Sequence, residues 1–256
     1  MKEGQKLWTR NELILAINLY CKLPFGKLHR SNPEVIELAS LIGRTPSSVA
    51  FKLVNFASFD PVLKARGIKG AQNASKLDQQ IWNEFYNDWD QLPFESEKLK
   101  AKYMGKSVED ISEISLDDLP KEGKTRTQTV KVRVNQSFFR KMILASYNWK
   151  CCITGISNLE LLVAGHIRPW GVDVKNRMNP QNGIALNALH DRAFESGLIT
   201  ILPNFKVKVS GILKKEKSIA ARDYFLKYDG QAIELPSRFF PSKEFLEYHN
   251  DERFRK

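Results

Sequence analysis

Two of the four histidines, His166 and His190, lie in a stretch of residue types that can carry out hydrolysis. A neutral imidazole can accept a proton near pH 7, and it can also bind a divalent metal ion. Asn182 lies between these histidines, and Asp191 and Glu195 follow them. A histidine in such a group could serve as a base for hydrolysis near neutral pH. The other histidines, at positions 29 and 249, have no such neighbours and receive no role.

The elements that must position these residues are two strands and a helix. Residues 161–167 are apolar and predict a buried strand, which a proline ends at position 169. A polar loop follows, then a second short strand at 183–186 and a helix at 187–196 that ends at Gly197. The result is a ββα unit with one histidine at the end of a strand and the other on the helix.

This unit resembles the HNH endonuclease family, in particular its restriction-endonuclease-like group. The residues that carry the resemblance are A-G-H-I-R-P-W at 164–170, N-G-I-A-L at 182–186, and the His, Phe and Glu of the following helix. It covers roughly Phe138 to Thr200. The resemblance implies a ββα-metal fold that binds one divalent ion (Mg²⁺, Mn²⁺ or another) and hydrolyses DNA phosphodiester bonds. It also implies a restriction-type defence enzyme that acts on double-stranded DNA, modified or unmodified.

The resemblance also implies roles for individual residues. His166 matches the general base, which takes a proton from the attacking water. Asn182 matches the asparagine that braces the long loop, and His190 matches the metal ligand on the helix. Arg168 is placed next to the base in the sequence, and we expect it to contact a phosphate beside the scissile bond.

One position departs from the family pattern. Many members have Asp or His before the base, where it binds the metal, whereas this chain has Gly165. The second protein ligand is then Asp173, Asp191 or Glu195, or else His190 holds the ion with phosphate and water alone. The same departure leaves an alternative function, a DNA-binding protein or regulator with a degenerate HNH module. A nuclease that acts on RNA is a third hypothesis.

The charge of the chain favours a polyanionic partner. The formal net charge is +11, and each phosphate that a basic side chain neutralises releases counterions. No acidic residue lies between positions 123 and 158. Its basic residues, Arg133, Arg140 and Lys141 among them, form either a face that follows phosphates or a solvated basic face.

The N-terminal segment has the pattern of a helix-turn-helix. A helix at 33–42 ends near Gly43, and Thr45-Pro46 can begin the next helix after a short turn. This interpretation places a group of polar residues against DNA, whereas the alternative is a plain helical hairpin. The group comprises Arg44, Thr45, Ser47, Ser48 and Lys52.

The predicted fold class is α+β, with a helical DNA-recognition domain and a ββα-metal nuclease domain. The helical domain covers residues 1–104, a linker 105–129, and the nuclease domain 130–256. The alternation Val130-Lys131-Val132-Arg133-Val134 predicts a short strand, followed by a helix that Asn135 caps.

Composition excludes several classes of protein. No run of about 18 apolar residues is present, so no membrane span is expected, and the polar N-terminus predicts a cytoplasmic protein. The three cysteines give no disulfide framework. Cys151 and Cys152 lack the second pair of a zinc site, so we expect a buried turn there. Cleavage of both strands by one site per chain predicts a homodimer.

Overall fold

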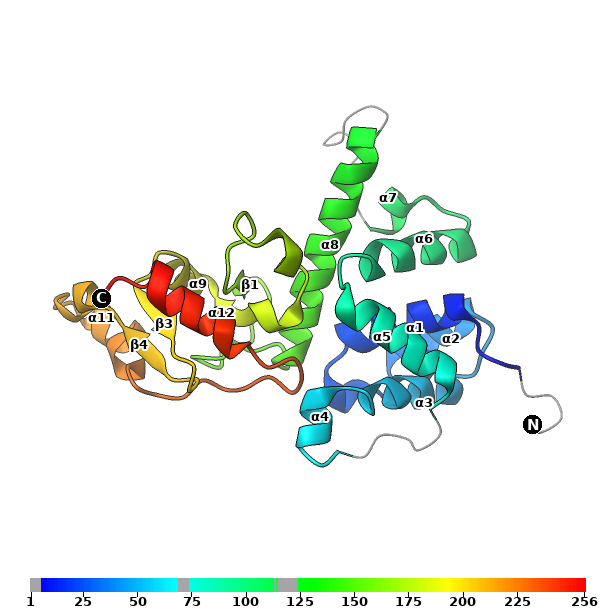
Figure 1. Ribbon diagram of the computed structural model, residues 1–256, viewed down its shortest axis with the longest axis horizontal. Coiled ribbons are helices and arrows are strands. Elements are labelled where there is room, and N and C mark those ends of the chain that lie inside the picture. The colour runs from blue at the N-terminus through cyan, green and yellow to red at the C-terminus, as the bar shows by residue number, and fades with distance from the viewer. Residues whose placement is uncertain (1–5, 69–73, 113, 115–123) are drawn as a thin grey trace. The chain divides into compact units, whose positions relative to one another are not determined.

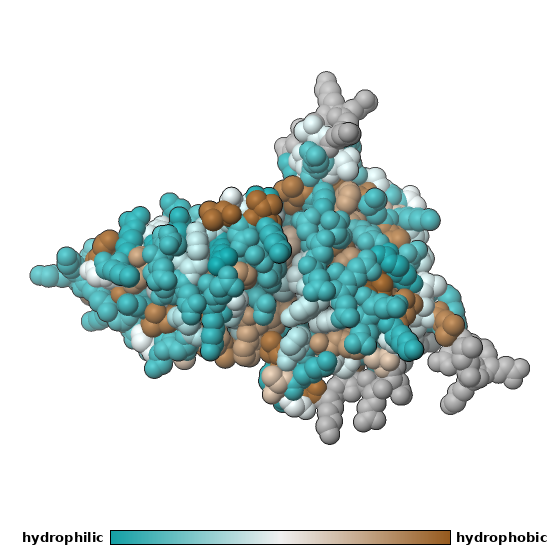
Figure 2. Space-filling view, viewed as in Figure 1, coloured by the Kyte–Doolittle hydropathy of each residue, from teal (hydrophilic) through white to brown (hydrophobic). Residues whose placement is uncertain are grey.

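The computed structural model describes residues 6–68, 74–112, 114 and 124–256 (Figure 1). The chain divides into two compact units, residues 1–138 and residues 139–256. The first unit is helical where it is described, and the second combines helices with two small antiparallel sheets. No helix in the described ranges is both long and apolar enough to cross a membrane. On the face shown in Figure 2, hydrophilic side chains predominate and hydrophobic ones are scattered.

The helices of the first unit begin where the sequence provides caps. They are α1 (Arg10–Lys22), α2 (Pro33–Leu41), α3 (Pro46–Ala57), α4 (Pro61–Ala65), α5 (Lys76–Asn87), α6 (Leu92–Met104) and α7 (Val108–Ile111). Thr9 and Glu12 form a reciprocal capping box at the start of α1. Asn32 and Thr45 cap α2 and α3, each of which has proline at its first position. The predicted helix, turn and helix at 33–57 are therefore present.

The helix α8 (Lys124–Ser146) occupies the region where a strand was expected. The strand prediction at 130–134 is wrong, because Val130 and Val134 are one helical turn apart and pack together against Phe94, Val108 and Ile114. Val132, which the alternation placed with them, is 44% exposed. Asn135 lies inside the helix and donates hydrogen bonds to Asp90 instead of capping.

The predicted linker at 105–129 is only partly described. Helix α7 and the first residues of α8 lie within it. Its remaining residues at 113 and 115–123 are outside the described residues. The sequence in this range therefore forms regular structure at both of its described ends.

The second unit contains the predicted ββα arrangement. Strand β1 (Leu162–His166) pairs antiparallel with β2 (Gly183–Asn187), and His166 lies opposite Gly183. Helix α9 (Ala188–Glu195) follows at once, capped by Asn187, whose side chain accepts a hydrogen bond from the His190 amide. The remaining elements are β3 (Ile199–Ile201), β4 (Val207–Val209), α10 (Gly211–Lys214), α11 (Ile219–Tyr224), α12 (Lys243–Tyr248) and a π-helical turn (His249–Arg253). Helix α9 packs against β1, β2 and β3.

Two glycines allow close approaches that shape this unit. A side chain at Gly183 would collide with Ile143 and Phe139 of α8, so glycine lets β2 lie directly on that helix. Gly197, which ends α9, has φ +71°, and a Cβ there would collide with the backbone of Arg253. The C-terminal segment can therefore lie against the end of α9.

Candidate active site

The His166 side chain is fixed at the end of β1 by ring contacts and one hydrogen bond. Its ring stacks on Phe139 at 4.1 Å between centroids, and the Trp170 ring meets it edge-on at 5.5 Å. Its Nε2 lies 2.9 Å from the carbonyl oxygen of Arg177. A carbonyl oxygen only accepts, so Nε2 carries the proton of the neutral ring and leaves Nδ1 able to accept one.

The protonation state of His166 suits this arrangement. Burial lowers its pKa, and the hydrogen bond to the Arg177 carbonyl offsets only part of that effect. The imidazole is therefore neutral at pH 7. A neutral ring with a fixed tautomer is what a general base requires.

Asn182 holds the loop between the two strands. It is fully buried, and its Oδ1 accepts a hydrogen bond from the Arg168 amide at 2.7 Å. Its Nδ2 donates to the carbonyls of Arg168 and Asn176, at 3.2 and 3.1 Å. The side chain thus joins the segment directly after His166 to the far part of the loop, which includes the turn that carries Arg177.

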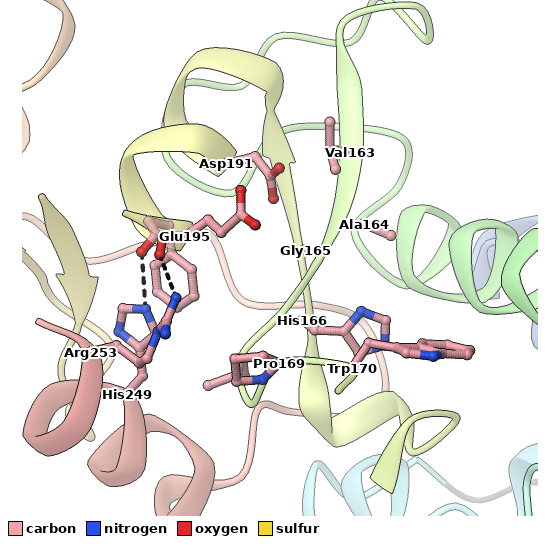
Figure 3. A pocket seen from close by; sticks show the side chains of 12 residues that line it. Val163, Ala164, Gly165, His166, Pro169, Trp170, Asp191, Glu195, His249 and Arg253 are labelled. Atoms are coloured by element: carbon pink, nitrogen blue, oxygen red, sulfur yellow. Dashed lines mark hydrogen bonds between the residues drawn. The ribbon is translucent and has the colours of Figure 1, made fainter. Parts of the chain in front are cut away.

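A pocket of about 280 Å³ lies beside His166 and is called the carboxylate pocket here. Its lining includes His166, Trp170, Asp191, Phe194, Glu195 and His249. Figure 3 shows the carboxylates of Asp191 and Glu195, from successive turns of α9, pointing toward one another. The His166 ring lies on the other side of Gly165 in the same view. The pocket thus holds a pair of oxygen ligands, and it is also lined by His166, whose ring packs on Phe139 across β1 from the two carboxylates.

Gly165 makes room for one of these carboxylates. A Cβ at this position would lie 2.5 Å from Asp191 Oδ1, so any side chain here would require the Asp191 carboxylate to move. The Asp191 carboxylate from α9 thus occupies the place that a side chain at position 165 of β1 would fill. Burial, and then the negative charge of Glu195, raise the pKa of Asp191 to about 6.

His190 does not line this pocket, so the structure does not bring this predicted metal ligand together with Asp191 and Glu195. It is 2% exposed, and its ring lies against Phe225 and Tyr228 at 5.3 and 5.6 Å. Its Nδ1 is 3.1 Å from Asn187 Oδ1, and burial lowers its pKa. Asp191, the next residue along α9, faces the pocket instead, because adjacent helical residues point about 100° apart.

Arg168 is held by carboxylates rather than directed at the pocket. Its guanidinium pairs with Asp173 at 3.2 Å and with Glu244 at 2.8 Å, and it lies over the rings of Phe245 and Tyr248. Asp173 is occupied by this contact and by Asn176. The predicted phosphate contact of Arg168 is therefore not supported, and Asp173 is not placed as a metal ligand.

The basic residues predicted to bind nucleic acid have different surroundings. Arg140 donates to the carbonyls of Leu159 and Leu162, so it supports the start of β1. Lys141 is exposed and Arg133 is half-buried on the same helix. Of these three residues, Lys141 is thus the most accessible to a phosphate.

In the first unit, two of the predicted DNA contacts are buried in ion pairs. Arg44 pairs with Glu12 at 2.8 Å and Lys52 with Asp78 at 2.8 Å, and all four side chains are at least nine-tenths buried. These cations hold helices together, and contact with DNA would leave their partners unpaired. Thr45 and Ser47 are exposed, Ser48 is half-buried, and the Thr45 hydroxyl caps α3.

His249 lines the pocket, although the sequence analysis assigned it no role. Its Nδ1 lies 2.8 Å from the Thr200 hydroxyl and its Nε2 3.1 Å from the Phe194 carbonyl. The ring stacks on Phe194 at 3.7 Å, and burial lowers the pKa of His249 to about 4. Its partners are 49 and 55 residues away, so no local motif could have revealed it.

The neutral state of His249 predicts that acid destabilises the second unit. The unfolded chain binds a proton near pH 6.5 and the folded chain only near pH 4, so stability is present above pH 6.5 and is lost as the pH falls toward 4. We expect a loss of about 2 kcal/mol at pH 5 relative to pH 7 from this residue. Denaturant unfolding at both pH values measures it.

A His249→Gln variant should be less stable at pH 7 and should show a smaller difference between the two pH values. Thr200→Ser, which retains the hydroxyl, is the matched control and should keep the full difference. An equal loss of stability in wild type and His249→Gln would contradict the prediction.

The segment that contains the site matches a known protein family. Residues 151–202 match the sequence model of a family described as HNH endonuclease. The matched range contains β1, β2 and α9, with His166, Asp191 and Glu195. Comparison with curated proteins finds no match to the chain.

Proposed function

Since residues 151–202 belong to the HNH endonuclease family, we propose that this chain is a metal-dependent DNA endonuclease that hydrolyses phosphodiester bonds. The observation that carries the proposal is that the carboxylates of Asp191 and Glu195 line the same pocket as His166, whose ring is held by a hydrogen bond. The alternative, a DNA-binding regulator with a degenerate HNH module, depended on the missing ligand at Gly165. Gly165 no longer favours it, because the Asp191 carboxylate occupies the space beside this glycine.

The pocket suits a hard divalent ion such as Mg²⁺ or Mn²⁺. Asp191 and Glu195 are the residues that would hold it, because both line the pocket and carboxylate oxygens are the ligands that such an ion prefers. Within the described ranges, no three His, Cys, Asp or Glu side chains are grouped to bind a metal by themselves. This fits Mg²⁺, which is commonly held by one or two carboxylates together with substrate phosphates and water.

The chain's own residues then account for proton transfer. Nδ1 of His166 accepts a proton from the attacking water as the new oxygen–phosphorus bond forms and the bond to the 3′-oxygen breaks. The Arg177 carbonyl keeps the ring in the required tautomer, and Phe139 keeps its plane fixed. A divalent ion held by Asp191 and Glu195 would stabilise negative charge on the phosphate and the leaving oxygen.

The remaining expectations extend this proposal to the whole chain. The helical first unit would select the DNA, through the exposed start of α3 at Thr45 and Ser47 rather than through the buried cations. The resemblance favours a restriction-type role, and a homodimer would supply a second copy of this site so that both strands are cut.

The test is cleavage of supercoiled plasmid by the purified full-length chain. We expect nicking or linearisation with Mg²⁺ or Mn²⁺, and none with EDTA. The reaction is run on modified and unmodified plasmid and with competing RNA, which separates a DNA enzyme from one that acts on RNA. Tight DNA binding without cleavage under any of these conditions would favour the regulator instead.

A further inference from the structure

We propose that a second pocket at the end of α9, called the arginine pocket, binds a phosphate of the DNA backbone. This phosphate would be the neighbour, on the same strand, of the phosphate that is cut. The inference rests on the proposed nuclease function. The pocket has a volume of about 300 Å³ and is lined by Arg192, Glu195, Ser196, Glu252, Arg253 and Arg255. Nothing in the sequence motif points to it, since three of its residues lie in the last five positions of the chain.

The arginine pocket adjoins the carboxylate pocket. Glu195 and Arg253 line both of them. Figure 3 shows Arg253 beside Glu195, with its guanidinium hydrogen-bonded to the backbone of α9. A strand whose scissile phosphate lies near Asp191 therefore brings a neighbouring phosphate toward the arginines, because successive phosphates follow one another along the strand.

Two hydrogen bonds to the end of α9 hold the C-terminal segment that forms this pocket. Arg253 Nη2 donates to the Glu195 carbonyl at 3.0 Å, and the Arg255 amide donates to the Gly197 carbonyl at 2.9 Å. Gly197 permits this approach because any Cβ there would collide with the Arg253 backbone. The C-terminal segment is thus fixed on the end of α9, which gives the arginines a defined position.

The charges of the pocket favour an anion once the active site is loaded. Three guanidiniums face two carboxylates, Glu195 and Glu252. Arg192 pairs with Glu195 at 3.1 Å, but the side chains are 77% and 64% exposed, so the pair is weak and exchangeable. When Glu195 serves the cation, Arg192 can bind a phosphate, whose oxygens match the two-pronged guanidinium.

The experiment measures DNA affinity as a function of salt, in a His166→Ala background that leaves the DNA uncut. The test variant is Arg192→Ala with Arg255→Ala, which spares the backbone contact of Arg253. The control is Arg222→Ala with Lys217→Ala. It also removes two positive charges, one on α11 and one just before this helix. Arg222 is 67% exposed and pairs with a neighbouring carboxylate, as Arg192 does.

We expect the test variant to bind duplex DNA about tenfold more weakly than its parent at moderate salt. The slope of log K against log salt should fall by about 1, as one phosphate contact is lost. The control should change neither quantity comparably. Arg192→Lys with Arg255→Lys should retain most of the slope while recovering only part of the affinity, since lysine lacks the paired donors.

Equal affinity and slope in test and control variants would overturn the inference while leaving the nuclease proposal intact, provided that wild type cuts DNA. Failure of wild type to cut and of the His166→Ala parent to bind DNA would overturn both. Thermal unfolding of each variant, expected to be unchanged because the replaced side chains are exposed, shows that any loss of affinity comes from the lost charges.

Discussion

His166→Ala is expected to lower metal-dependent plasmid cleavage by about 10²- to 10⁴-fold, with DNA affinity unchanged. The loss follows from the position of the ring, whose Nε2 is held by the Arg177 carbonyl and whose Nδ1 is free to accept a proton. Without the imidazole, the attacking water keeps its proton until bulk solvent removes it. Single-turnover cleavage at saturating enzyme separates this chemical defect from weaker binding.

The matched controls are His166→Gln and His190→Gln. Glutamine at 166 retains bulk against Phe139 without the basic nitrogen, so it should be as inactive as alanine while preserving the fold better. His190→Gln removes the other motif histidine, which is buried away from the pocket. It should keep its rate per folded molecule. Cleavage by His166→Ala at more than a tenth of the wild-type rate would rule out the base assignment.

Asp191→Asn is expected to abolish metal-dependent cleavage and, at the same time, to make the metal-free protein more stable at pH 7. The carboxyl ionises near pH 4 when unfolded but only at about pH 6 when folded. The ionised carboxylate therefore lowers the free energy of unfolding, and this destabilisation is fully present above pH 6. Asparagine removes that cost, which we place at about 1 kcal/mol because the carboxyl is partly solvated.

Thermal unfolding with and without Mn²⁺ tests both halves of this prediction. The wild-type midpoint should rise with the ion, because a ligand that binds only the folded state stabilises it, whereas Asp191→Asn should show little response from a higher starting point. Glu195→Gln should also lose the response, and His190→Gln should retain it. An unchanged metal response in Asp191→Asn would assign the ion to other residues.

The elements that form the site could be predicted because local signals define them. An apolar strand, a polar loop, a second strand and an Asn-capped helix appear in the order expected, and the caps at Thr9, Asn32 and Thr45 all form. The strand expected at 130–134 failed because alternating valines also place two of them one helical turn apart. A small cluster beneath that helix decides between the two, and it is visible only in three dimensions.

The orientation of individual side chains was harder to predict. His190 and Asp191 are neighbours on α9, and the resemblance favoured the histidine as a ligand, but the helix turns the carboxylate toward the pocket and the imidazole into the core. Arg44, Lys52 and Arg168 look like phosphate ligands in a basic chain. Each instead meets a carboxylate supplied by a distant segment. Charge pairing across long sequence separations leaves no local pattern.

The Asp191 carboxylate occupies the space that a side chain at position 165 would need, so the residues allowed at these two positions depend on each other. A larger residue on the strand requires a smaller or differently directed one on the helix, because both cannot occupy the same volume. A side chain added at Gly165 alone is then penalised, while paired changes can move the carboxylate between strand and helix. Among relatives of this chain, the two positions should covary, and a search that demands an acid or a histidine before the base would overlook members that use the helix.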